Sequence, residues 1–139
     1  MKSLPLKLGV VLIGLFIFGD AEVRGEDWKE FAKNERTFCY YDAESISRPS
    51  KNIIKVEVKF EYTKIGITEF VNTFGDKFKK LDNSKSLYEV NCLEKKYRIL
   101  ELVFYSKDGN VLDMISIPSE WKYNVRESVS DALDITVCQ

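Results

Sequence analysis

The chain has 139 residues, of which 45% are hydrophobic and 31% charged, and it contains no histidine. The lack of histidine excludes Ser-His and Cys-His nucleophiles, histidine zinc ligands and CxxCH haem attachment. A formal charge of −1 argues against a nucleic-acid-binding protein that neutralises phosphates. We therefore predict no catalytic residue, no cofactor and no transition-metal site, whereas carboxylate sites for calcium are less firmly excluded.

The amino terminus has the layout of a secretory signal peptide. Two lysines lead into an uncharged apolar run over residues 8–18, which is too short to span a membrane. Small residues allow cleavage after Ala21 or, nearly as well, after Gly25. Removing residues 1–21 leaves one domain, residues 22–139, with a formal charge of −2 and no transmembrane span. We expect this chain in the periplasm, at the outer membrane or on the cell surface.

Alternation of apolar and polar residues predicts an antiparallel sheet. The pattern is clearest from Ile53 to Thr63, where lysines and glutamates occupy every second position, so one face is buried and the other is wet. Asp108-Gly109 supplies the positive backbone angles that a tight hairpin turn needs. The strands predicted in chain order are 36–41, 53–63, 87–92, 97–106 and 111–117.

Glu57 and Glu61 form a carboxylate pair of the kind that acid-base chemistry uses. They alternate with Lys55 and Lys59, and alternating charge of this kind is typical of a solvated strand face. We assign both glutamates to the outer face of the sheet rather than to a catalytic site.

Two segments have helical spacing. Phe70, Phe74 and Phe78 recur every fourth residue between residues 63 and 80, which predicts a helix that packs on its own sheet rather than on a membrane surface or a partner. Near the carboxyl end, Asn124 followed three residues later by Glu127 predicts the capped start of a second helix. The fold class is therefore α+β, with a middle helix and a carboxyl-terminal helix on an antiparallel sheet.

Three cysteines lie far apart in the sequence: Cys39, Cys92 and Cys138. Export permits disulfides, and a disulfide near the carboxyl terminus would stabilise a last helix that would otherwise fray. Loop-closure entropy does not choose between Cys39 with Cys92 and Cys92 with Cys138, because the two loops are similar in length.

Six stretches of the chain resemble the bacterial surface-adhesin E (protein E) family. They run from Asp27 to Cys138 and are "DWKEF", "YYDAESI", "LYEVNCLEKKYRIL", "YSKDGNVL", "PSEWKY" and the terminal "VC". The resemblance implies a meander-type sheet with its carboxyl-terminal helix held by a disulfide, which matches Cys92 and Cys138 here and leaves Cys39 as a free thiol.

The same resemblance implies adhesion to host proteins, and none of the six stretches is a catalytic motif. We therefore expect an exported, non-enzymatic protein-binding domain of the bacterial envelope, with an unidentified protein partner and unknown ligand-binding residues. The sequence is also compatible with a homodimer. The alternative function is a thiol-redox or intermolecularly disulfide-linked periplasmic protein that acts through Cys39.

Overall fold

An antiparallel sheet of eight strands is the framework of residues 26–139, the part of the chain that the computed structural model describes. The predicted signal peptide lies outside these residues. The strands are β2 (Trp28–Lys33), β3 (Thr37–Asp42), β4 (Ser47–Ser50), β5 (Ile53–Tyr62), β6 (Leu81–Asn91), β7 (Lys96–Ser106), β8 (Val111–Ile115) and β9 (Lys122–Tyr123). The helices are α3 (Lys64–Phe74) and α4 (Val129–Val137), with short 3-10 turns η1 (Ala43–Ser45) and η2 (Asp76–Phe78).

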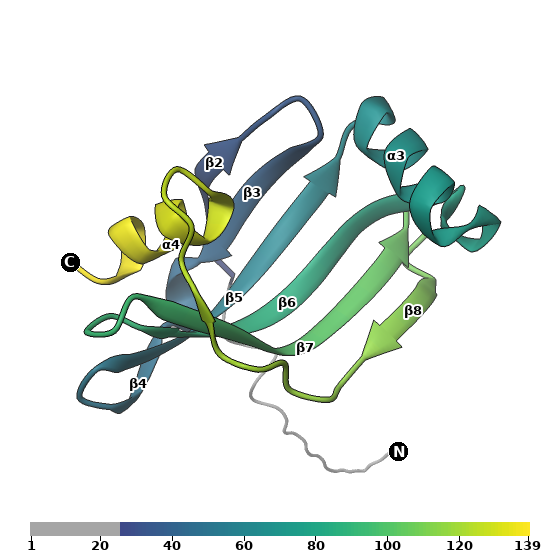
Figure 1. The fold of residues 1–139 in the computed structure, drawn as a ribbon. Coiled ribbons are helices and arrows are strands. Elements are labelled where there is room, and N and C mark those ends of the chain that lie inside the picture. The colour runs from purple at the N-terminus through teal and green to yellow at the C-terminus, as the bar shows by residue number, and fades with distance from the viewer. Residues whose placement is uncertain (1–25) are drawn as a thin grey trace, which may run out of the picture.

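The predicted α+β class is confirmed. The strand order is β2-β3-β5-β6-β7-β8, with β4 paired to β5 and β9 paired to β7, and both helices lie on one face of the sheet (Figure 1). All pairings are antiparallel, as the meander-type prediction requires. Gly109 has a φ of 85° in the turn before β8, as its place in the hairpin predicted.

The sequence reading missed β2, β4 and β9, and it began β6 six residues late. Between Leu81 and Tyr88 the strand β6 points Ser84 and Ser86 into the core, so its inward face has no apolar alternation there. The Tyr62 hydroxyl contacts the Ser84 hydroxyl at 2.9 Å, which gives the buried serine a hydrogen-bond partner.

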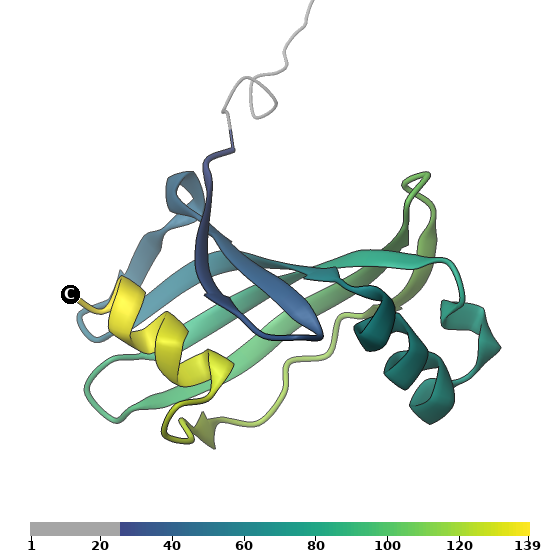
Figure 2. The same ribbon diagram turned by 90° about the horizontal axis from the view of Figure 1, so that it is seen from above.

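Two hydrophobic clusters lie on the same face of the sheet, one beneath each helix. Leu133 and Val137 of α4 cover the first cluster, which contains Ile54, Val56, Val58, Tyr88 and Val90. Phe78, Leu81 and Phe104 form the second cluster, against which α3 packs. Figure 2 shows that the two helices stand well apart along the sheet, so the inner face between them is not covered by a helix.

The predicted continuous helix over residues 63–80 is wrong at its carboxyl end. The α3 helix ends at Phe74, because Gly75 adopts a φ of 108° and the chain then enters η2. Phe78 nevertheless packs on Phe70 with ring centroids 4.8 Å apart. The phenylalanine stripe therefore predicted the packing partners correctly although the helix between them is interrupted.

The predicted start of the last helix at Asn124 is also wrong. The helix begins at Val129, and Ser128 is its cap, since Ser128 Oγ accepts a hydrogen bond from the Asp131 amide at 3.2 Å. The Asp131 carboxylate accepts in turn from the Glu127 amide at 3.0 Å. Asn124 instead donates from Nδ2 to the buried Asp134 carboxylate at 2.9 Å.

The disulfide joins Cys92, just after β6, to Cys138, just after α4, with a Cα–Cα distance of 5.6 Å. On an ideal helical wheel Cys138 faces away from the core. Cys138 can nevertheless reach Cys92, because α4 ends at Val137 and Cys138 lies outside the helix. A bond from Lys95 Nζ to Asp134 Oδ1 at 3.0 Å fastens the same helix to the β6–β7 turn.

Candidate functional site

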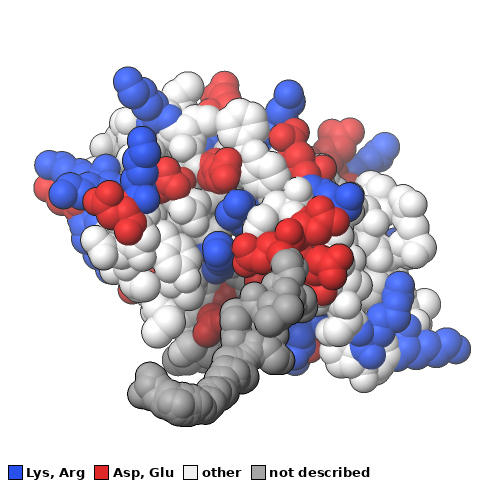
Figure 3. Space-filling model, turned by 180° about the vertical axis from the view of Figure 1, so that it is seen from behind, with Lys and Arg blue, Asp and Glu red and all other residues white. Residues whose placement is uncertain are grey.

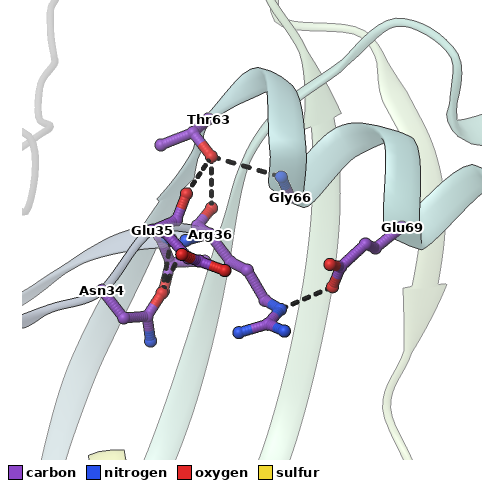
Figure 4. A network of polar contacts seen from close by, with 7 residues as sticks. Asn34, Glu35, Arg36, Thr63, Gly66 and Glu69 are labelled. Atoms are coloured by element: carbon purple, nitrogen blue, oxygen red, sulfur yellow. Dashed lines mark hydrogen bonds and ion pairs between the residues drawn. The ribbon is translucent and has the colours of Figure 1, made fainter.

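The start of α3 is held against the turn between β2 and β3 (Figure 4). Thr63 Oγ1 donates to the Glu35 carbonyl at 2.6 Å and accepts from the Gly66 amide at 3.2 Å. The Thr63 amide donates to the Arg36 carbonyl at 3.0 Å. An ion pair between Arg36 and Glu69 links the same turn to the next turn of the helix. The position of α3 is thus set by hydrogen bonds and an ion pair to the β2–β3 turn, and not by apolar packing alone.

Between the helices the sheet face contains a groove of about 400 Å³. The groove is bounded by α3 and η2 on one side and by strands β5 to β8 beneath and beside it. Its size is within the range of small-ligand pockets, which are mostly apolar with a few polar groups. The aromatic residues that line it are Phe60, Tyr62, Phe70, Phe74, Phe78, Tyr88 and Phe104.

Phe70 is at the centre of this lining. Its ring lies 4.7 Å from the ring of Phe74, 5.2 Å from that of Phe104 and 5.7 Å from that of Tyr62, measured between centroids. Edge-to-face and tilted arrangements of this kind add stability beyond area burial. Phe74, by contrast, is 60% exposed and forms part of the open rim of the groove.

Few polar groups reach the groove, and the charged ones are paired. Lys77 Nζ donates to Asp113 Oδ2 at 2.9 Å, and this bond holds the pKa of the Asp113 carboxyl below its ordinary value. Burial raises the pKa values of the Tyr62 and Tyr88 hydroxyls, so both stay neutral at physiological pH. The groove is therefore suited to apolar side chains, with a single ion pair on its rim.

Cys39 lies away from the disulfide and is a free thiol within the core. Its Sγ lies 3.5 Å from Thr37 Oγ1, within hydrogen-bonding distance. Burial raises the pKa of the thiol, and a reactive cysteine needs an accessible thiolate. The setting of Cys39 does not favour the redox alternative.

We expect Cys39 to resist alkylation in the folded protein and to be the single site of labelling after unfolding without reductant. Iodoacetamide at pH 8 followed by peptide mass spectrometry measures both states. Rapid labelling of the folded protein, or any labelling of Cys92 or Cys138 without reductant, would contradict this expectation.

The sheet's other face, seen from behind in Figure 3, is charged. Glu61 pairs with Lys59 at 3.6 Å, as expected for a solvated strand face. The ammonium groups of Lys59 and Lys85 also stand 4.7 and 5.9 Å from the centre of the Trp28 ring. Glu57, the other member of the carboxylate pair, lies close to Glu26 and Asp42.

The fold is a small antiparallel sheet with a helix at each end of one face, a disulfide just after the second helix and an aromatic groove beside the first helix. Residues 28–139 match the family model described as Surface-adhesin protein E. The chain therefore belongs to the surface-adhesin protein E family, as the sequence motifs predicted. No curated protein and no solved structure shows significant similarity to the chain.

Family membership implies a surface adhesin, and hence an exported or surface-located protein that binds a partner. In the region that the structure describes, no helix has both the length and the apolar character needed to cross a bilayer. The sequence offered no ligand-binding residues. The sequence pointed to the groove only through Phe70, Phe74 and Phe78, whose spacing predicts a helix packed on its own sheet.

Proposed function

We propose that the protein is an exported, non-enzymatic adhesin that binds an extended segment of a partner protein in the aromatic groove beside β8. The observation that carries this proposal is the position of the groove next to a free sheet edge. Neither feature depends on a catalytic group, and the chain contains no histidine.

The β8 strand is the last strand of the sheet, paired on one side with β7. Among the described strands none pairs with its other side. Unpaired backbone groups on such an edge can accept an added strand, and the side chains of that strand then occupy adjacent pockets. Ile115 and Asp113 point into the groove, so a partner strand along β8 would place alternate side chains against the same surface.

The exposed apolar residues support the same location. Ile115 of β8 is 49% exposed, and Ile117 follows β8 with 79% exposure. Exposed apolar residues beside the groove, together with Phe74 on its other side, are typical of a protein-interaction surface. The Lys77–Asp113 ion pair on the rim would orient a polar group of the partner.

Ile115→Lys should weaken partner binding by about tenfold or more, because it places a charge in the apolar groove. Met114→Lys is the matched control, since the same strand carries it on the opposite face at similar exposure. A photo-crosslinking residue at position 74 would first capture the partner in the native envelope, with position 93 as the exposed control away from the groove. Binding of the identified partner is then measured by biolayer interferometry.

We expect Ile115→Lys to lose affinity while its thermal midpoint stays near that of the wild type, and Met114→Lys to retain affinity. Hydrogen exchange should show β8 amides becoming protected on binding. If both variants bind as the wild type does, or both lose affinity equally, the groove is not the binding site. If position 74 captures a second copy of the chain and Ile115→Lys loses the dimer, the groove is a homodimer interface and not the site for a partner protein.

A further inference from the structure

Three carboxylates meet on the outer face of the sheet where the described chain begins. One ligand oxygen from each of Glu26, Asp42 and Glu57 lies within 4.8 Å of the others. Figure 3 shows acidic side chains gathered on this face beside the start of the described chain. The residues come from three segments: the chain before β2, the end of β3 and the middle of β5.

Asp42 is the central member of the group and is fully buried. Its Oδ1 accepts hydrogen bonds from the amides of Asp27 and Glu44, both at 2.9 Å. Its Oδ2 is buried and accepts no hydrogen bond from any residue in the range 26–139. A buried carboxylate oxygen without a donor is costly, because most buried polar atoms in proteins are satisfied.

The surrounding cations do not neutralise this group. Lys29 pairs with Asp27 at 3.6 Å, and Lys59 pairs with Glu61 and stands over Trp28. No lysine or arginine of the described residues is within ion-pair distance of the three carboxylates. Like charges this close repel each other strongly in a partly buried setting, so the arrangement favours a bound cation.

We propose that Glu26, Asp42 and Glu57 bind a calcium ion that fastens the start of the domain to the sheet. Calcium takes six to eight oxygen ligands, often carboxylates, and tolerates irregular geometry, whereas transition metals prefer nitrogen and sulfur ligands that this group lacks. Three carboxylates leave further ligand positions for water. Sites of extracellular modules bind calcium with a Kd of about 0.1 to 1 mM, and we expect a value in this range.

The ion would act on the first strand. Trp28 of β2 pairs in register with Asp42 of β3, and its indole Nε1 donates to Glu26 Oε1 at 3.2 Å. A cation bound to both carboxylates would therefore hold β2 at its edge of the sheet. The adhesin function proposed above is not needed for this inference, since the groove lies on the opposite face.

The test uses the protein as the cell produces it, stripped with EGTA and titrated with calcium chloride at constant ionic strength. Thermal unfolding should shift upward by about 5 °C at ten times the Kd. Terbium, a luminescent substitute for calcium, should show emission sensitised by Trp28, and calcium should displace it. Trp28→Phe should lose this emission, and Trp121→Phe should not.

Glu57→Gln should weaken calcium binding by about tenfold or more, because it removes one charged ligand. Glu61→Gln is the matched control, since it removes one charge from the same face of β5 outside the site. Glu26→Gln, at an exposed position, repeats the test without any change to the core. Each of the two ligand variants should keep the thermal midpoint of the wild type in EGTA or exceed it.

Three results would overturn the proposal. The first is no shift in the thermal midpoint and no terbium emission up to 10 mM ion, about ten times the upper expected Kd. The second is equal loss of calcium binding in Glu61→Gln and Glu57→Gln. The third is a site filled by the α-amino group of a chain cleaved after Gly25, in which case Glu57→Gln would lower stability in EGTA and calcium would have no effect.

Discussion

Replacement of Cys138 by serine should lower the free energy of unfolding by up to about 4 kcal/mol. The disulfide closes a loop of 46 residues, and the chain-entropy model gives this value before native strain and residual unfolded structure reduce it. For a domain of this size the thermal midpoint should fall by about 15 °C. Circular dichroism measures the midpoint, and limited proteolysis should cut first in or near α4, whose end is then untethered.

The control for this change is the third cysteine. Cys39→Ala removes one buried sulfur without opening a covalent loop, and we expect a loss of about 1 kcal/mol. Reductant should lower the thermal midpoint of the wild type to that of Cys138→Ser. It should leave the midpoint of Cys138→Ser unchanged, because that variant has no disulfide to reduce. A midpoint for Cys138→Ser equal to that of the oxidised wild type would show that the staple contributes little.

Substitution of Gly66 by alanine should displace the start of α3 and lower the free energy of unfolding by about 2 kcal/mol. A Cβ atom at this position would lie 2.3 Å from the Arg36 carbonyl oxygen, which is backbone and has no rotamer to change. Alanine is the better helix former by about 1 kcal/mol, so any net loss reports the clash. Because Phe70 and Phe74 follow on the same helix, the groove should be distorted as well.

Thr68→Ala is the matched control, since it introduces the same residue at an exposed position of the same helix. Its stability should be equal to or slightly above that of the wild type. Denaturant unfolding measures both variants, and partner binding should fall in Gly66→Ala alone. If Gly66→Ala were as stable as Thr68→Ala, the contact between α3 and the β2–β3 turn would be too soft to position the helix.

Much of the fold was determined locally. Alternating residues in β5 identified the buried and wet faces, because successive strand side chains point to opposite sides. Gly109 determined the β7–β8 hairpin, since its φ of 85° is an angle that few other residues adopt, whereas Asp108 does not have a positive φ. The motifs from Asp27 to Cys138 also identified the family, and with it the disulfide partner of Cys92 that loop entropy left undecided.

The sites were decided only by the tertiary structure. The groove is made by residues from Phe60 to Ile115 that belong to a helix, a 3-10 turn and four strands, and no local pattern marks which apolar side chains stay uncovered. Glu57 belonged to a regular charged strand face in the sequence, yet strand pairing brings it to a buried Asp42 and to Glu26. Period and turn chemistry act over a few residues, whereas cross-strand register and helix placement bring together groups that lie tens of residues apart.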